Sequence, residues 1–247
     1  MRTAVFVAAG LGSRLKDRTA QRPKGFLEVE GSALVETSLG RLRRAGIERI
    51  VIGTGYLAEH YDALAERYRG TLAIETLRSD RFETTGSMYT LYNLRSRLDE
   101  DFLLLESDLL YEQRALTALI GDPRPDAVLI SGFTGSRDEV WVESDADSNL
   151  VNLSKNRAAL GEAHGELVGI SKVSLQTYRL MCGVMETELE RTPKLDYEGA
   201  LVRVSQHGRP VPVLRLADLA WCEIDDEGHL RRAIDQVLPA IRENDAI

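Results

Sequence analysis

The chain has 247 residues, of which 43% are hydrophobic, and this permits one large α/β domain or two small ones. Its formal net charge is −8, which disfavours a general nucleic-acid binder because such proteins are usually basic. Its two cysteines, Cys182 and Cys222, have no metal-site or disulfide spacing, and the lack of a leader or a long apolar run predicts a cytoplasmic protein without membrane insertion.

The first predicted element is a strand at 3–7 that leads directly into a glycine-rich turn. The turn contains Gly10, Gly12 and Arg14, and Lys24 follows ten residues later. Backbone N–H groups at the end of such a strand suit phosphate oxygens, and glycine lets the backbone approach an anion closely. Arg14 and Lys24 add the positive charge that a polyphosphate needs. The turn lacks the endings of the Walker and dinucleotide motifs, so taken alone it also suits an ordinary tight turn.

Strands and helices alternate through the first half of the chain. We expect strands at 49–54, 71–75, 101–106 and 126–132, and helices at 32–45, 58–68, 87–98 and 113–120. This alternation predicts an α/β fold of the Rossmann-like, doubly wound type with a mostly parallel sheet. Ligands of such a sheet bind at the carboxyl ends of its strands, where the glycine-rich turn and Ser107 both lie.

The second half is less regular and forms a smaller, β-rich insertion. We expect strands at 140–143, 150–154, 167–173, 211–216 and 221–224, and helices at 174–191, 197–206 and 227–242. No linker or internal repeat divides the sequence, so we expect a single domain over 1–247, with its two halves meeting near residue 132.

Two aspartates follow predicted strands directly. Asp108 lies after the strand at 101–106, and Asp225 lies between the last strand and the closing helix. A carboxylate placed there costs free energy unless something pairs with it, and Mg²⁺ takes one or two carboxylates together with phosphate oxygens. The alternative is that Asp108 caps the next turn and that Asp225 or Asp226 caps the closing helix.

Together these motifs resemble a known signature. Gly-x-Gly-x-Arg followed by Pro-Lys, carried here by residues 10–14 and 23–24, is typical of nucleotidyltransferases of the sugar-nucleotide pyrophosphorylase type. Later stretches at 84–91, 196–198 and 223–225 look most like the small cytidylyltransferases, a subgroup that includes the phosphocholine and 2-aminoethylphosphonate enzymes.

The resemblance implies a role for each candidate residue. The half at 1–132 would bind the nucleotide and the half at 133–247 the acceptor. Arg14 would hold the leaving pyrophosphate, Lys24 would contact the α-phosphate, and Asp108 and Asp225 would hold one Mg²⁺. The other residues expected at the nucleotide are Ala8, Ala9, Gly10, Gly12, Ser13, Thr85, Gly86, Ser87 and Ser107. Thr85 and Ser87 also suit a helix N-cap, and the loop that contains them leaves the base open, with a lean to cytidine.

The acceptor half offers groups for a small cationic head group. Trp141, Tyr197, Glu198 and Glu223 could surround it, and Lys155 could hold its phosphate. Trp141 also suits a packed core, and Lys155 a solvated surface. Carboxylates outnumber aromatics in this half, which favours a primary amine over trimethylammonium and 2-aminoethylphosphonate over phosphocholine.

The resulting hypothesis is an Mg²⁺-dependent nucleotidyltransferase that converts CTP and 2-aminoethylphosphonate, or a phosphocholine-like acceptor, to a CMP conjugate and pyrophosphate. One rival is a sugar-1-phosphate or inositol-1-phosphate nucleotidyltransferase, and another is a catalytically silent nucleotide-sensing domain. A Rossmann oxidoreductase is disfavoured, because 53–55 lacks the acidic residue that would hold a ribose. The sequence does not indicate the pathway or the oligomeric state, and a homodimer is one alternative.

Overall fold

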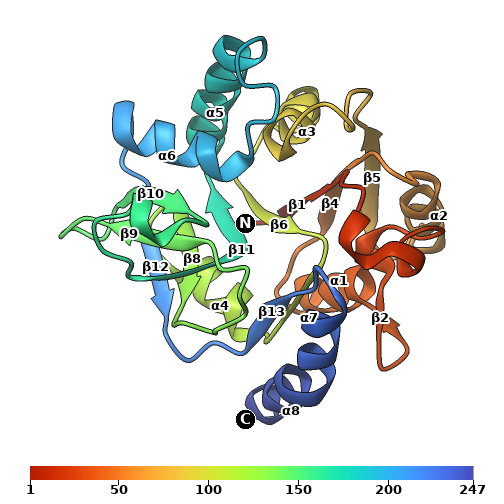
Figure 1. The fold of residues 1–247 in the computed structure, drawn as a ribbon. Coiled ribbons are helices and arrows are strands. Elements are labelled where there is room, and N and C mark those ends of the chain that lie inside the picture. Colours follow the sequence, from red (N-terminus) through yellow and green to blue (C-terminus); the bar gives the residue numbers. More distant parts are fainter. Residues whose placement is uncertain (247) are drawn as a thin grey trace.

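A nine-stranded sheet runs through the centre of the computed structural model, which describes residues 1–246 (Figure 1). Its strands are β1 (Thr3–Ala8), β4 (Arg49–Thr54), β5 (Ala73–Arg78), β6 (Phe102–Glu106), β8 (Ala127–Ser131), β9 (Trp141–Ser144), β10 (Leu150–Ser154), β11 (Gly165–Val173) and β12 (Val213–Leu216). The main path is β10-β9-β11-β6-β1-β4-β5, and β8 joins β11 to β12 beside it.

The central strands β5, β4, β1 and β6 are parallel, as the alternation of elements predicts. Their side chains alternate between two apolar clusters: Val5 lies in one, while Ala4 and Phe6 lie in the other. β11 then runs antiparallel to β6 and connects β8 and the β9–β10 hairpin to the same sheet. The predicted β-rich second half therefore extends the central sheet at one edge.

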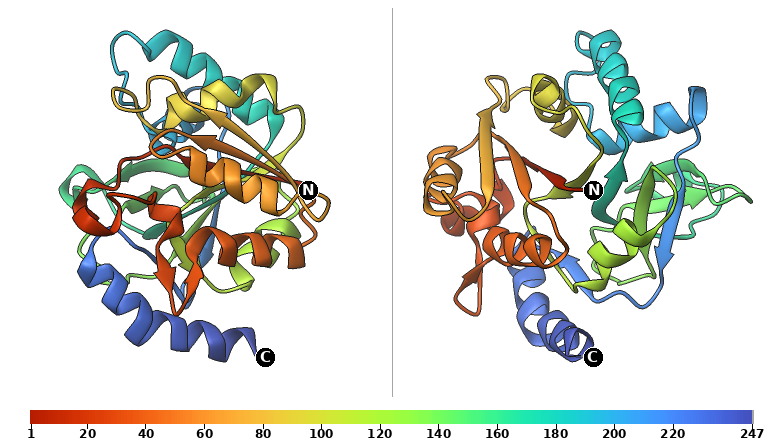
Figure 2. Two further views of the ribbon diagram at one scale, coloured as in Figure 1. Left: turned by 90° about the vertical axis from the view of Figure 1, so that its right-hand side faces the viewer. Right: turned by 180° about the vertical axis from the view of Figure 1, so that it is seen from behind.

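Helices cover both faces of this sheet (Figure 2). They are α1 (Leu34–Arg44), α2 (Glu59–Arg67), α3 (Ser87–Asn93), α4 (Arg114–Gly121), α5 (Leu175–Glu188), α6 (Tyr197–His207), α7 (Glu227–Arg232) and α8 (Leu238–Asp245), with a π-helical segment at Ala233–Val237 and short 3-10 turns at Ser13–Arg18, Lys24–Phe26, Leu94–Ser96 and Arg157–Ala159. α3, α5 and α6 pack into one apolar cluster, and α1, α2 and α4 into the other. None of the helices within 1–246 has the length and apolar character needed to span a membrane.

Local sequence signals set several helix boundaries. α1 buries Leu34, Leu39 and Leu42 at helical spacing, and Gly46 follows its end with a φ of +84°, a conformation that glycine adopts without strain. α5 begins after Ser174, whose side chain accepts a hydrogen bond from the backbone N–H of Thr177. Both helices therefore begin and end close to the predicted residues.

Three very short strands were not expected from the sequence. β2 (Glu28–Val29) pairs with β3 (Ser32–Ala33), and β7 (Leu109–Tyr111) pairs with β13 (Trp221–Glu223), which lies within the predicted strand at 221–224. Strands of two or three residues show no readable periodicity, and β7 finds its partner more than a hundred residues away. The predicted strand at 71–75 is also displaced, since β5 covers 73–78.

Candidate active site

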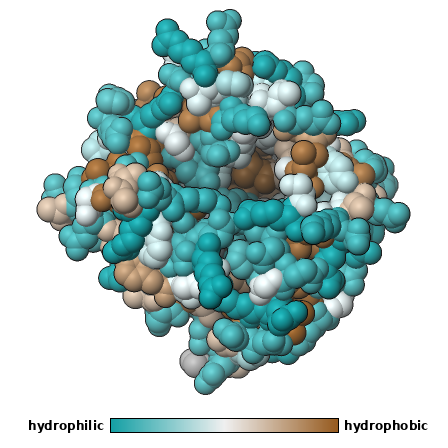
Figure 3. Space-filling model, in the orientation of Figure 1, coloured by the Kyte–Doolittle hydropathy of each residue, from teal (hydrophilic) through white to brown (hydrophobic). Residues whose placement is uncertain are grey.

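A cavity of about 500 Å³ lies at the carboxyl ends of β1 and β6. Figure 3 shows this face hollowed near its centre, with apolar side chains at the base and hydrophilic ones around the rim. Every residue that the sequence assigns to the site lines this cavity except Trp141: Ala8, Ala9, Gly10, Gly12, Ser13, Arg14, Lys24, Thr85, Gly86, Ser87, Ser107, Asp108, Lys155, Tyr197, Glu198, Glu223 and Asp225. The fold thus gathers groups from both halves around one space.

The glycine-rich turn after β1 folds over the stem of Lys24. Gly12 has a φ of +64°, and its carbonyl accepts a hydrogen bond of 2.9 Å from the Thr19 hydroxyl. A Cβ at Gly12 would lie 2.7 Å from Cγ of Lys24, so a larger residue would collide with the lysine stem as well as strain the backbone. Gly12 therefore keeps the turn close to Lys24.

Lys24 lies at the centre of a group of carboxylates. Its Nζ donates to Asp108 and to Asp225, and it is 3.7 Å from Oε1 of Glu223. Burial opposes the charge of Lys24, but the three carboxylates outweigh burial and raise its pKa. Burial likewise opposes ionisation of Asp225, yet Lys24 and Arg14 hold its pKa well below the usual range. Both partners therefore stay charged.

The unexpected β7–β13 pair explains why two distant aspartates meet. Glu223 pairs with Leu109, and the backbone N–H of Ile224 donates to the carbonyl of Asp108 at 3.1 Å. Asp226, not Asp225, caps α7: its Oδ1 accepts from the backbone N–H of His229 at 2.8 Å. Of the two aspartates that could cap the closing helix, Asp226 is therefore the cap, and Asp225 lines the cavity.

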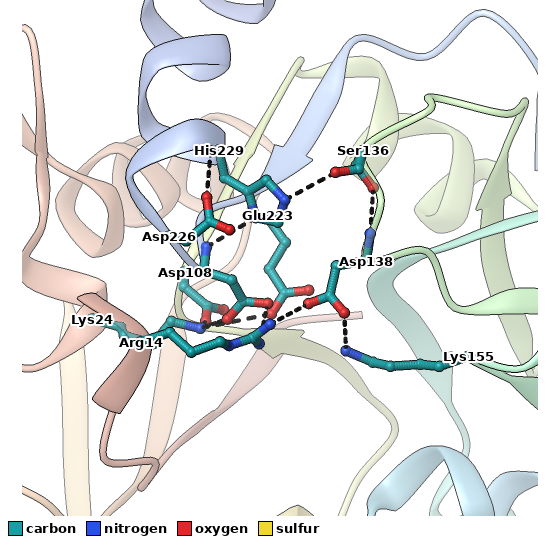
Figure 4. Close-up of polar contacts among 10 residues, drawn as sticks. Arg14, Lys24, Asp108, Ser136, Asp138, Lys155, Glu223, Asp226 and His229 are labelled. Atoms are coloured by element: carbon teal, nitrogen blue, oxygen red, sulfur yellow. Dashed lines mark hydrogen bonds and ion pairs between the residues drawn. The ribbon is translucent and has the colours of Figure 1, made fainter. Parts of the chain in front are cut away.

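Asp138 joins two exposed cations at the rim of the cavity (Figure 4). Its carboxylate accepts from Nη1 of Arg14 at 2.7 Å and from Nζ of Lys155 at 2.9 Å. Nη2 of Arg14 lies 2.6 Å from Oδ2 of Asp225, so the guanidinium bridges two carboxylates. Lys155 thus reaches the cavity and is not only a solvated surface residue.

Three carboxyl groups lie close together at the end of the cavity where the sequence places the acceptor, which we call the acceptor end. They belong to Glu106, Glu198 and Glu223, and the Tyr197 hydroxyl donates to Oε1 of Glu106 at 2.6 Å. Burial first, and repulsion by neighbouring carboxylates second, raise the pKa of Glu106 and Glu198 to about 8 and that of Glu223 to about 10. The strongest repulsion comes from Asp196 for Glu198 and from Asp108 for Glu223. Within residues 1–246, Oε2 of Glu198 is buried without a hydrogen-bond partner. This end of the cavity therefore holds carboxyl groups that keep their protons near neutral pH and outnumber the cations beside them.

The donor set fits a divalent cation. Glu106, Asp108 and Glu223 each offer a carboxylate oxygen, and the three oxygens lie within 4.8 Å of one another. Asp225 is not one of these three, but it shares the Nζ of Lys24 with Asp108. Mg²⁺ prefers carboxylate and phosphate oxygens, which is the chemistry that this group supplies.

The loop around Gly86, which the sequence predicts at the nucleobase and which we call the base loop, packs against the acceptor half of the chain. Gly86 packs so closely on 193–195 that a Cβ there would lie 2.3 Å from the carbonyl oxygen of Leu195. The Ser87 hydroxyl accepts from the backbone N–H of Tyr197, the first residue of α6, at 2.9 Å. Gly86 itself occupies the N-cap of α3, and the Thr85 hydroxyl donates to the carbonyl of Arg81. Neither hydroxyl caps α3 as the sequence alternative suggested.

Trp141 is the one predicted site residue that the structure does not bring to the cavity. Its ring packs against Phe133 at 5.2 Å, and the guanidinium of Arg157 lies 4.9 Å from its centre. The Arg157 guanidinium therefore lies over the Trp141 ring, where the sequence predicted a cationic ligand. Trp141 is not packed in the core either, since its side chain is half-buried.

Three residues that contribute to the site were not predicted from the sequence. Glu106 ends the buried strand before Asp108, and a charged residue at the end of an apolar run was the available signal. Phe82 lines the cavity beside the base loop. Asp138 reaches Arg14 from 124 positions away, a contact that no local pattern indicates.

A family model described as the MobA-like NTP transferase domain matches residues 4–173. The CMP-5'-(3-aminopropyl)phosphonate synthase of Streptomyces rubellomurinus is 29% identical over 93% of this chain, which spans only 38% of that protein's length. The 2-aminoethylphosphonate cytidylyltransferase of Lancefieldella rimae is 27% identical over 76% of this chain and 74% of its own length.

Solved structures share the fold. The inositol-1-phosphate CTP transferase from T. maritima superposes with a TM-score of 0.82, at 20% identity, over 98% of this chain and 97% of its own. The CTP:phosphocholine cytidylyltransferase from Streptococcus pneumoniae gives a TM-score of 0.77 at 21% identity, over 95% of this chain and 99% of its own. These likenesses confirm the predicted Rossmann-like α/β architecture.

Proposed function

Since the chain belongs to the MobA-like NTP transferase family, we propose that it is an Mg²⁺-dependent cytidylyltransferase acting on a small aminoalkyl phosphonate, with 2-aminoethylphosphonate as the preferred acceptor. Two relatives whose names include an aminoalkyl phosphonate support this choice. The acceptor end of the cavity supports it independently.

The observation that carries the proposal is the excess of carboxyl groups at that end. Glu106 and Glu198 make no ion pair among residues 1–246, and a primary ammonium can donate three hydrogen bonds to such groups. Trimethylammonium donates none and relies on aromatic faces, and Trp141, one of the two aromatics that the sequence offered for it, lies outside the cavity under Arg157. A sugar ring carries no cation and could not form an ion pair with these carboxyl groups.

The proposed reaction is an in-line displacement at the α-phosphorus of CTP. A phosphonate oxygen of the acceptor forms the new P–O bond, and the bond to the bridging oxygen of the β-phosphate breaks, so that pyrophosphate leaves. The attacking oxygen is already anionic and needs no general base. Catalysis is then positioning and charge neutralisation.

The residues of the cavity divide this work. Arg14 holds the leaving pyrophosphate, Lys155 holds the acceptor phosphonate, and Lys24 exchanges its carboxylates for oxygens of the α-phosphate. Asp108 and Asp225 are the proposed Mg²⁺ ligands, and the bound ion supplies further neutralisation of phosphate charge. The glycine-rich turn and 85–87 line the nucleotide end.

The test is an acceptor panel run with each of the four nucleoside triphosphates and scored by pyrophosphate release. We expect the highest kcat/KM for CTP with 2-aminoethylphosphonate, and no reaction after chelation of the metal. Faster turnover of phosphocholine, a sugar 1-phosphate or inositol 1-phosphate would contradict the acceptor assignment. Absence of turnover with every pair would favour the nucleotide-sensing alternative.

A further inference from the structure

Asp138 is the shared partner of the two exposed cations that line the cavity. The side chains of Arg14 and Lys155 are 54% and 56% exposed, and each donates to a different oxygen of this one carboxylate. Arg14 comes from the glycine-rich turn, whereas Asp138 and Lys155 come from the acceptor half. In Figure 4 both cations point at Asp138 from opposite sides.

The loop that carries Asp138 is anchored on buried groups. The Ser136 carbonyl lies 3.1 Å from Nε2 of His229, and the backbone N–H of Thr134 donates to buried Glu166 at 2.7 Å. His229 also accepts, through Nδ1, from the backbone N–H of Asp225 at 3.3 Å. The loop backbone is therefore fixed relative to Asp225, while the carboxylate of Asp138 can leave by a side-chain rotation.

An anion that binds either cation must compete with this carboxylate. Under the proposed function, Arg14 and Lys155 hold different anions, the pyrophosphate part of the nucleotide and the acceptor phosphonate. A triphosphate on Arg14 removes one of the two partners of Asp138 and places like charge beside it. The Asp138 carboxylate is then more favourably solvated by water than held between the two cations. Its movement leaves Lys155 free to bind another anion.

We propose that Asp138 is a positioning residue that couples the two substrates. In the ligand-free protein it holds Arg14 and Lys155 together as an internal anion. Nucleotide binding displaces the Asp138 carboxylate, and the Lys155 ammonium then binds the phosphonate. The acceptor consequently binds after the nucleotide, and removal of the Asp138 charge abolishes that order.

Calorimetry tests this coupling directly. The affinity for 2-aminoethylphosphonate is measured without nucleotide and with a saturating Mg²⁺ complex of a CTP analogue whose α,β-methylene bridge prevents pyrophosphate release. In the wild type we expect the analogue to tighten acceptor binding by about tenfold, a usual size for coupled sites. Asp138→Asn is expected to bind the acceptor alone about tenfold more tightly than wild type and to lose the coupling. In turnover, the variant should lower KM for the acceptor while leaving kcat the same or lower.

Asp147→Asn is the matched control, because Asp147 is an exposed carboxylate in the same half, on the turn between β9 and β10. It should retain the wild-type coupling. Equal coupling in wild type and Asp138→Asn would overturn the proposal. Absence of coupling in the wild type would also overturn it, and that measurement does not depend on the variant folding. The same titrations with inorganic pyrophosphate and methylphosphonate require no turnover, so a failed acceptor panel and a failed coupling test are separate results.

Discussion

Lys24 carries its charge in the middle of the carboxylates that surround the nucleotide end of the cavity. We predict that Lys24→Ala lowers kcat by about a hundredfold to a thousandfold, because a positioned charge at a transferring phosphoryl group is usually worth that much. Pyrophosphate release measures the loss, and circular dichroism checks that the fold survives.

Lys194→Ala is a suitable control for the Lys24 variant, since Lys194 is exposed and forms no ion pair with any of residues 1–246. It should behave as wild type. A folded Lys24→Ala protein with normal turnover would remove Lys24 from the mechanism.

Glu198 and Glu223 are expected to select the acceptor through its ammonium. We predict that Glu198→Gln and Glu223→Gln each raise KM for 2-aminoethylphosphonate by about tenfold, the usual cost of losing a hydrogen bond to a charged group. Ethylphosphonate lacks the amine and provides the comparison: its poorer KM should be little changed by either substitution. An unchanged KM for the amine in both variants would show that these carboxyls do not bind it.

The close contact between the base loop and the acceptor half rests on Gly86. We predict that Gly86→Ala lowers the free energy of unfolding by about 1–3 kcal/mol, because the new methyl group would overlap the Leu195 carbonyl and force the segments apart. Gly40→Ala is the matched control: this glycine of α1 has no atom within 4 Å of an added Cβ, and the change should stabilise by up to about 1 kcal/mol. Thermal melting of both variants distinguishes overlap from a general effect of replacing glycine.

The sequence was sufficient for the elements that depend on local pattern. Parallel strands such as β4, the stop of α1 at Gly46 and the glycine-rich turn are all readable from spacing and residue type, and the family prediction is confirmed by the family model. β7 was missed because three apolar residues show no periodicity. Its pairing with β13 nevertheless brings Asp108 and Asp225 to the same lysine, Lys24. A motif thus indicates which residues serve the site, while long-range pairing decides how they meet.

Trp141 and Asp138 illustrate the same limit in side chains. A strand tryptophan near an expected cationic ligand is a reasonable candidate, but Arg157 covers its ring, and loop packing rather than strand pattern decides that contact. Asp138 belonged only to a count of carboxylates in the acceptor half, and its position between Arg14 and Lys155 depends on how the two halves close around the cavity.

At the scale of the whole molecule, residues from both halves of the chain line one cavity. The nucleotide end pairs its carboxylates with Lys24 and Arg14, and so its charges balance in the absence of ligand. Glu106 and Glu198 have no such ion-pair partner within residues 1–246, whereas Glu223 lies 3.7 Å from Lys24. Ionisation of these buried carboxyl groups is therefore unfavourable in the folded chain, and the free energy of unfolding should depend on pH.

Glu198 allows this dependence to be tested. Burial first, then Asp196 and Glu223, raise its pKa from 4.5 to about 8. Between these values the folded chain binds more protons at Glu198 than the unfolded chain does, and stability must fall as the pH rises. Glu198→Gln cannot ionise. We therefore predict that it melts at the same temperature as wild type near pH 4.5. Above pH 8 it should be more stable than wild type by roughly a few kcal/mol, since each pKa unit corresponds to about 1.4 kcal/mol.

Glu190→Gln controls for the loss of an exposed carboxyl just beyond α5 and should follow the wild-type curve at every pH. Saturating 2-aminoethylphosphonate should flatten the wild-type curve, because an ammonium beside Glu198 favours the ionised carboxylate and lowers its pKa. Ethylphosphonate supplies the same anion without the cation and should leave the slope in place. Parallel melting curves for wild type and Glu198→Gln from pH 4.5 to 8.5 would mean that the unfavourable charge lies elsewhere in the molecule.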